Sequence, residues 1–165
     1  MIIKKNLFSP HKYNYVRGVR PKVDCILCAV INKEKNVDKL VVFENKLWLI
    51  TLNLFPYNPG HIMIFPRRHI EDVRLLNEQE WHNLQKLQNE SMNILEKIYN
   101  PTGYNLGFNI GKDGGASIAH IHYHIVPRYK NEIGFVEIFS DARIIVEDPQ
   151  ITKKKLQKEF KKIKI

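Results

Sequence analysis

His120-Ile-His-Tyr-His-Ile-Val126 is a run in which histidine alternates strictly with large apolar or aromatic residues. A period of two is typical of a β-strand, so His120, His122 and His124 are expected to share one face. The three imidazoles would then lie about 6.5 to 7 Å apart. Because the ordinary pKa of histidine, about 6.5, allows a neutral nucleophile or base at physiological pH, the row indicates a reactive site. The alternative is a solvated polar face that happens to consist of histidine.

Length and composition favour one domain. The chain has 165 residues, of which 44% are apolar, and this is enough for a hydrophobic core. We expect a single domain over 1–165, with an extended N-terminal arm over 1–23. No stretch approaches the roughly 18 apolar residues of a membrane span, and residues 1–6 offer no apolar run for a secretory signal. A cytoplasmic protein without membrane contacts is therefore predicted.

The positive charge is concentrated near the C-terminus. Residues 153–164 contain seven lysines and one acidic residue, so they supply +6 of the formal net charge of +9. Within this tail Leu156, Phe160 and Ile163 recur at helical spacing, which predicts a basic amphipathic helix over 149–165. A docked helix with a solvated outer face is the simplest interpretation, and attraction of polyanionic ligands is the alternative. Nucleic acid is not favoured as a partner, because the tail has no series of aromatic residues interleaved with its lysines.

Turn signals and periodicity predict the fold class α+β. The long helix begins at Asn77, an N-cap with Glu80 three residues later, and ends near Asn100. One face of this helix carries Trp81, Leu84, Leu87, Ser91, Leu95 and Ile98. Because strands do not alternate with helices as in βαβ units, we expect an antiparallel sheet of about five strands with a long and a C-terminal helix. The strands are expected at 41–43, 47–50, 61–65, 106–110 and 119–126.

Two further motifs suggest ligands. In the glycine-rich turn over 109–117, backbone N–H groups, the Asn109 amide and the Ser117 hydroxyl could donate to phosphate oxygens. Such turns often only reverse the chain, but this one lies three residues before the histidine row. Cys25 and Cys28 are spaced as Cys-x-x-Cys, which in a reducing compartment suggests a metal half-site or a redox pair.

With these motifs the chain resembles the histidine triad (HIT) superfamily, whose motif is His-φ-His-φ-His-φ-φ, where φ is apolar. The likeness covers roughly residues 7–130. Within the superfamily, the chain is most similar to the branch of diadenosine tetraphosphate phosphorylases and dinucleoside polyphosphate hydrolases. The matching segments are Leu7–Pro10, Cys25–Cys28, Asn53–His61, Pro66–His69, Asn109 and Pro127–Tyr129.

The resemblance implies catalytic roles. His122 would attack the α-phosphorus of a nucleotide, and water or phosphate would cleave the nucleotidyl-histidine. His124 would contact phosphate oxygens, and His120 completes the triad. No magnesium is strictly required, because histidines and backbone amides supply a positive field. The implied substrate-binding residues are Asn53 for ribose, His61 in the site wall, and Asn109, Gly115, Ala116, Ser117 and His124 for phosphate. Ala116 stands where many members carry glutamine, so one polar contact is missing.

The resemblance also implies a structural zinc site formed by Cys25, Cys28, His69 and His120. Two thiolates and two imidazoles make a closed tetrahedral site. The alternative is two small buried side chains and a surface histidine.

These inferences combine into a homodimeric nucleotidyl hydrolase or transferase that cleaves dinucleoside polyphosphates. One alternative is a nucleoside phosphoramidase that removes AMP from an amine. Another, of a different class, is a zinc-stabilised nucleotide- or RNA-binding module without turnover. All three triad histidines, Asn109 and Ser117 are present, which argues against lost chemistry.

Overall fold

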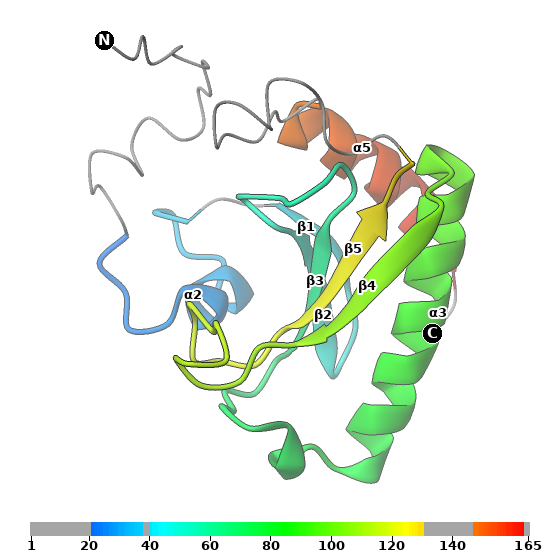
Figure 1. Ribbon diagram of the computed structural model, residues 1–165. Coiled ribbons are helices and arrows are strands. Elements are labelled where there is room, and N and C mark those ends of the chain that lie inside the picture. Colours follow the sequence, from blue (N-terminus) through cyan, green and yellow to red (C-terminus); the bar gives the residue numbers. More distant parts are fainter. Residues whose placement is uncertain (1–20, 38–39, 131–146, 164–165) are drawn as a thin grey trace, which may run out of the picture.

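The computed structural model describes residues 21–37, 40–130 and 147–163, and Figure 1 shows their arrangement. Five strands form one antiparallel sheet in the order β1-β2-β3-β5-β4, which confirms the α+β class and the predicted sheet. The elements are α2 (Ile26–Ile31), β1 (Val41–Glu44), β2 (Trp48–Leu52), β3 (Ile62–Pro66), η2 (Val73–Leu75), α3 (Glu78–Tyr99), β4 (Gly103–Phe108), β5 (Tyr123–Arg128) and α5 (Pro149–Phe160).

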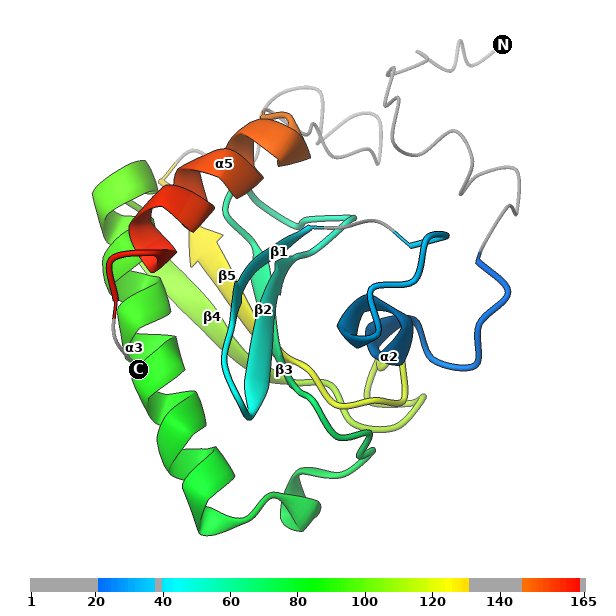
Figure 2. The ribbon, with the colours of Figure 1, turned by 180° about the vertical axis from the view of Figure 1, so that it is seen from behind.

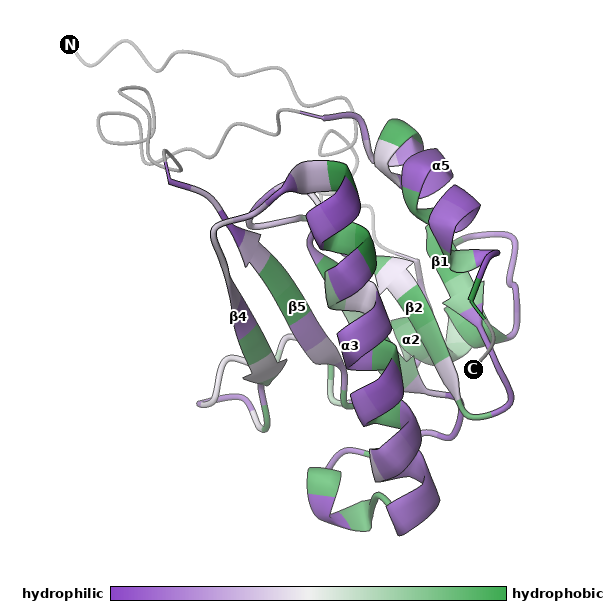
Figure 3. Ribbon diagram, turned by 90° about the vertical axis from the view of Figure 1, so that its right-hand side faces the viewer, coloured by the Kyte–Doolittle hydropathy of each residue, from purple (hydrophilic) through white to green (hydrophobic). Residues whose placement is uncertain are grey.

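Helices cover both faces of the sheet. Figures 1 to 3 show α3 and α5 on one face and the short helix α2 on the other. Because side chains alternate along a strand, neighbouring residues of β2 serve different cores: Trp48 packs towards α3 and α5, whereas Leu49 packs with Leu27 of α2. β3 divides in the same way, and this explains why all its residues are buried. The predicted β1–β2 hairpin is confirmed.

Helix α3 begins with the predicted capping box. The Asn77 side chain accepts a bond from the Glu80 amide, and the Glu80 carboxylate accepts one from the Asn77 amide. Arg68 binds the same carboxylate in a bidentate manner, at 2.6 and 2.7 Å. Of the residues on the predicted face, Trp81 is 44% exposed. It lies in the first turn and meets Phe108 edge-on, with ring centroids 6.3 Å apart, instead of packing in the core.

Two strand boundaries differ from the prediction. β5 begins at Tyr123 and not at residue 119, because the Ile121 amide donates to the Ile70 carbonyl at 2.8 Å and joins the segment after β3. The β4–β5 ladder therefore ends at the pair Phe108↔Tyr123. β4 begins at Gly103 and not at Leu106, because pairing with β5 compensates for the weak strand propensity of its first residues.

The predicted C-terminal helix is present as α5. Asp148 caps its N-terminus and Lys161 its C-terminus, so it is shorter than the expected 149–165. Leu156 and Phe160 are fully buried, which confirms a helix docked on the core. Residues 1–20 of the expected arm lie outside the described residues, as do 164–165. In the described segments, no helix combines the length and the apolar character that crossing a bilayer requires.

Candidate active site and metal centre

The histidine run sends its side chains to two neighbouring clusters. The His120 ring lies 4.8 Å from the His69 ring, between centroids. The His122 ring lies 4.7 Å from the His124 ring. Only His124 belongs to β5, so the expected single row along a strand was wrong for His120 and His122. The first cluster is called the Cys/His cluster below and contains Cys25, Cys28, His69 and His120; the second, the histidine pair, contains His122 and His124.

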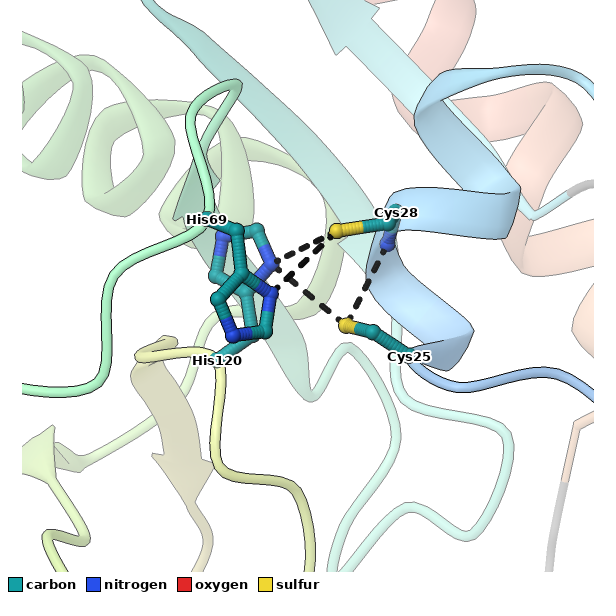
Figure 4. Close-up of side chains that lie close together, drawn as sticks. All are labelled: Cys25, Cys28, His69 and His120. Carbon is teal, nitrogen blue, oxygen red and sulfur yellow. Dashed lines mark hydrogen bonds between the residues drawn. The ribbon is translucent and has the colours of Figure 1, made fainter.

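The N-terminus of α2 positions both thiols of the Cys/His cluster. Cys25 is the N-cap and Cys28 lies in the first turn, so that the Cys28 amide reaches the Cys25 sulfur at 3.5 Å. Figure 4 shows the four side chains converging on one point. Their potential ligand atoms all lie within 4.8 Å of one another. The structure thus brings together all four residues that the sequence singled out.

The distances in the Cys/His cluster fit a tetrahedral metal ion. For metal–sulfur and metal–nitrogen bonds of about 2.3 and 2.05 Å, the S···N edge of a tetrahedron is about 3.6 Å. The Cys28 sulfur lies 3.3 Å from His69 Nδ1 and 3.6 Å from His120 Nδ1. The Cys25 sulfur lies 3.6 Å from His120 Nδ1. These four side chains could therefore hold a metal ion.

Neighbouring groups orient both imidazoles of this cluster. His120 Nε2 lies 3.0 Å from the Pro66 carbonyl, which can only accept, so Nε2 carries the proton and Nδ1 presents its lone pair to the sulfurs. His69 Nε2 lies 3.2 Å from the Glu71 carboxylate. Burial lowers the pKa of His120 to about 4, with His69 contributing, which favours the neutral form that a metal ligand needs.

His122 has the opposite tautomer. Its Nδ1 lies 3.0 Å from the His120 carbonyl and must donate, so the lone pair is on Nε2. The residue is 3% exposed, and burial lowers its pKa below the ordinary histidine value. The ring is therefore neutral at pH 7. Its Nε2 lone pair is not used in the hydrogen bond to the backbone, so this nitrogen can act as a nucleophile.

His124 ends a chain of directed hydrogen bonds. The Tyr57 amide donates to His61 Nδ1 at 3.1 Å, so the proton of a neutral His61 is on Nε2. That nitrogen donates to His124 Nδ1 at 2.9 Å, which leaves the His124 proton on Nε2. Within the described part of the chain, this buried Nε2 has no hydrogen-bond partner. Burial, with a contribution from His122, lowers the pKa of His124 to about 4.

Asn53 lies beside this chain. Its Nδ2 is 3.4 Å from His61 Nδ1, and its Oδ1 accepts a bond from the Phe55 amide at 3.0 Å. The backbone amide of Asn53 also donates to the His61 carbonyl. The implied contact of Asn53 with ribose stays a prediction.

The glycine-rich turn lies at the end of the β4–β5 ladder. Asn109 and His122 are the residues next to the last pair, and a Cβ on Gly115 would lie 3.8 Å from Asn109 Nδ2. The Gly115 and Ala116 amides donate within the turn, to the carbonyls of residues 112 and 111. Ser117 is exposed. Phosphate binding by Asn109, Gly115, Ala116 and Ser117 stays a prediction.

Sequence reasoning missed three supporting groups: the Tyr57 amide, the Pro66 carbonyl and the Glu71 carboxylate. Glu71 follows His69 by two residues, and this spacing could have indicated it. Backbone groups carry no such signal, because every residue has them. The Tyr57 ring also stacks on His61, with centroids 5.2 Å apart and the planes 12° from parallel.

Comparison with known proteins identifies the family of this chain. The HIT domain family model matches residues 34–131. An AP-4-A phosphorylase of Mycobacterium tuberculosis is 30% identical over 164 residues, covering 94% of this chain and 84% of the relative. An asymmetrical bis(5'-nucleosyl)-tetraphosphatase of Schizosaccharomyces pombe is 31% identical over 94 residues, 57% of this chain and 52% of the relative.

Solved structures share the fold. A zinc-bound histidine triad family protein from Mycobacterium smegmatis has a TM-score of 0.68 at 20% identity, covering 84% of this chain and 94% of that one. A HIT family member from Bacillus subtilis has a TM-score of 0.60 at 27% identity, covering 66% of this chain and 75% of that one. The chain belongs to the HIT family.

Proposed function

We propose that this protein cleaves dinucleoside polyphosphates, such as diadenosine tetraphosphate, through a nucleotidyl-histidine intermediate on His122. The observation that carries the proposal is the bond from His122 Nδ1 to the His120 carbonyl. It fixes the lone pair on Nε2, and burial keeps the ring neutral. The relatives described as a phosphorylase and a tetraphosphatase support this substrate class.

In the first step, His122 Nε2 attacks the α-phosphorus of diadenosine tetraphosphate. A bond forms between nitrogen and phosphorus, and the bond from phosphorus to the bridging oxygen breaks, so ATP leaves. Because His122 keeps its proton on Nδ1, the adduct carries a positive charge that the His120 carbonyl stabilises. Water then releases AMP, or inorganic phosphate releases ADP, and Nε2 regains its lone pair.

His124 would serve the reaction as a hydrogen-bond donor. Its protonated Nε2 is buried and unpartnered among the described groups, and its ring is next to His122. A phosphoryl oxygen placed between the two rings would satisfy this donor and gain stabilisation as charge develops on it. His61 supports the arrangement by holding the proton of His124 on Nε2.

We also propose that the metal of the Cys/His cluster is zinc. The four ligands are two sulfurs and two nitrogens, which suits zinc better than the hard cations calcium and magnesium. Zinc bound there would link α2 to the segment after β3 and to the segment before β5, with no position left open for substrate. The zinc-bound family protein from Mycobacterium smegmatis supports this choice.

A homodimer through the β4 edge is the arrangement we propose in solution. In the described part of the chain, β4 pairs with β5 alone and its outer edge meets no strand. Exposed apolar side chains gather near this edge: Leu106, Ile110 and Trp81 are 39%, 41% and 44% exposed. Sedimentation should show a dimer that Leu106→Lys converts to monomer; a monomeric parent protein would contradict the arrangement.

The function is tested by product analysis. Diadenosine tetraphosphate labelled on its adenosine phosphates is incubated with the protein, with and without inorganic phosphate, and the products are separated. AMP with ATP indicates a hydrolase, and ADP with ATP indicates a phosphorylase; either result supports the proposal. Release of AMP from adenosine phosphoramidate alone would assign the phosphoramidase alternative. Salt-dependent RNA binding without any turnover would overturn the enzymatic proposal.

A further inference from the structure

A tight turn of four residues leads the chain into β3. It runs Asn58-Pro59-Gly60-His61, and the His61 amide donates to the Asn58 carbonyl at 3.1 Å. Gly60 has a φ of +80°, and a proline at the second position followed by such a glycine at the third is typical of a type II β-turn. The turn packs closely against α3, because a Cβ on Gly60 would lie 2.9 Å from Leu95 Cδ2. The position of His61 relative to Asn58 is therefore fixed by the turn.

The Asn58 side chain ties this turn to β5. Figure 2 shows the segment between β2 and β3 at the end of the sheet where β5 finishes. The β3–β5 ladder ends at the pair Ile62↔Ile125, so the carbonyl of Pro127 lies beyond it. Pro127 is buried, and a buried carbonyl needs a hydrogen-bond donor. Asn58 Nδ2 donates to this carbonyl at 2.7 Å and so takes the place of a further backbone donor from β3.

Two side-chain hydrogen bonds thus join the turn to the same strand. One is the bond from Asn58 to Pro127. The other runs from His61 Nε2 to His124 Nδ1 at 2.9 Å, three residues earlier on β5. The His61 ring is also held within its own loop, because the Tyr57 amide donates to its Nδ1 at 3.1 Å. Since a hydrogen bond weakens steeply when its atoms move apart or out of line, the bond to His124 depends on how firmly the turn is held against β5.

We propose that Asn58 is a positioning residue, which holds His61 against His124 and so keeps the His124 proton on Nε2. It acts through the turn and not on the reacting atoms. Its effect on turnover rests on the proposed function, in which this N–H donates to a phosphoryl oxygen. The location of the proton does not, because it is a property of the free protein. The Tyr129 hydroxyl donates to the Pro59 carbonyl at 2.8 Å, so the turn stays attached to the chain after β5 when Asn58 is replaced.

The test is NMR spectroscopy of the full-length protein with ¹⁵N-labelled histidine, at neutral pH and without nucleotide. In the parent, His124 Nε2 should have the chemical shift of a protonated ring nitrogen and Nδ1 that of an unprotonated one. In Asn58→Ala the two shifts should approach each other, because the two tautomers then mix. We expect kcat for diadenosine tetraphosphate to fall by about 5- to 50-fold, with KM within about twofold. Unchanged His124 shifts in the folded variant would overturn the proposal. A parent without turnover would refute the proposed function, and the shifts would still decide the role of Asn58.

Two further variants separate this hydrogen bond from a general loosening of the fold. Asn58→Asp keeps the size of the side chain, but an ionised carboxylate cannot donate to the Pro127 carbonyl. It should therefore change the His124 shifts at least as much as Asn58→Ala, and it gives the answer if Asn58→Ala does not fold. Asn83→Ala removes a bond of 2.9 Å from the Asn45 side chain, between α3 and the β1–β2 hairpin, and should leave the His124 shifts and kcat as in the parent. If Asn58→Asp keeps the shifts of the parent, or if Asn83→Ala alters them equally, then the proposal is wrong.

Discussion

The Cys/His cluster and the histidine pair are built from neighbouring residues of one sequence run but present different chemistry. In His120 the carbonyl of Pro66, the last residue of β3, binds Nε2, so Nδ1 faces the thiols. In His122 the carbonyl of His120, in the same run, binds Nδ1, so the lone pair is on Nε2. Burial lowers the pKa of both. The difference between a candidate metal ligand and the proposed nucleophile is therefore set by which ring nitrogen binds a backbone carbonyl.

The surroundings extend this contrast. In the Cys/His cluster the potential ligand atoms of four side chains converge on one place, an arrangement that a metal cation can satisfy. Beside the histidine pair, each bond from Tyr57 through His61 to His124 alternates donor and acceptor and ends on an N–H. An anionic oxygen satisfies that end. One cluster is thus suited to a metal ion and the other to a phosphate, although they share a segment of chain.

Replacing the proposed nucleophile should have the largest effect. His122→Ala should lower kcat for diadenosine tetraphosphate by several orders of magnitude, because the attacking nitrogen is lost, while nucleotide binding persists. In quenched wild-type enzyme, labelled substrate should leave an acid-labile, base-stable adduct, which the variant lacks. His124→Ala is the matched control and should lose less, because it removes a donor only. Near-normal turnover in a folded His122→Ala protein would falsify the mechanism.

Opening the Cys/His cluster should act on stability first. Cys25→Ser should abolish stoichiometric zinc and lower the free energy of unfolding by at least about 3 kcal/mol, or roughly 6 to 12 °C in Tm. Elemental analysis and thermal denaturation measure the two effects. Glu71→Gln keeps all four ligands but weakens the orientation of His69, so zinc affinity should fall by about 10- to 100-fold. Protein purified without chelator that contains no zinc would contradict the assignment.

The donor chain can be broken without touching the histidine pair. His61→Phe keeps a ring beside Tyr57 but removes the donor to His124 Nδ1, so the His124 proton is free to move to Nδ1. We expect kcat to fall by about 10- to 100-fold, with a smaller change in KM. Tyr57→Phe retains the amide and the stacking and should leave kcat within about twofold. An equal loss in both variants would show that packing, and not the tautomer, matters.

The lowered pKa values predict how activity and stability respond to acid. Burial lowers the pKa of His122 below the ordinary histidine value of about 6.5, so the ring is still mostly neutral at pH 6.5. We therefore expect kcat/KM to stay level from pH 7 to below 6.5 and to fall only at lower pH. Diadenosine tetraphosphate has no terminal phosphate that titrates near neutrality, so the acid limb belongs to the enzyme.

The unfolded chain takes up a proton at His124 near pH 6.5 and the folded chain near 4, so stability should drop between these values. In His124→Gln this slope should be smaller.

The sequence predicted features that depend on nearby residues. The capping box of α3 and the β1–β2 hairpin were predicted because their signals lie within a few positions. The directions of His120 and His122 were not, because they depend on a hydrogen bond to Pro66, 54 residues away, and on where the ladder with β4 ends. Helix α2 was missed as well, because a cysteine serves as its N-cap. The four candidate ligands were identified only through the family resemblance, since Cys-x-x-Cys alone left a redox pair open.

The smallest effect is expected from the lysines of α5. Deleting the tail is not a clean test of its charge, because Leu156 and Phe160 are buried and truncation would damage the core. Lys154→Gln with Lys158→Gln removes two exposed charges and leaves the packing intact. Because exposed lysines act through a screened field, kcat should be unchanged and KM for diadenosine tetraphosphate should rise at most about threefold at low salt, and not at 0.5 M NaCl. A collapse of kcat at unchanged Tm would mean that α5 contributes directly to the reaction at the histidine pair. The basic surface of α5 and the neutral histidine pair would then not be independent of each other.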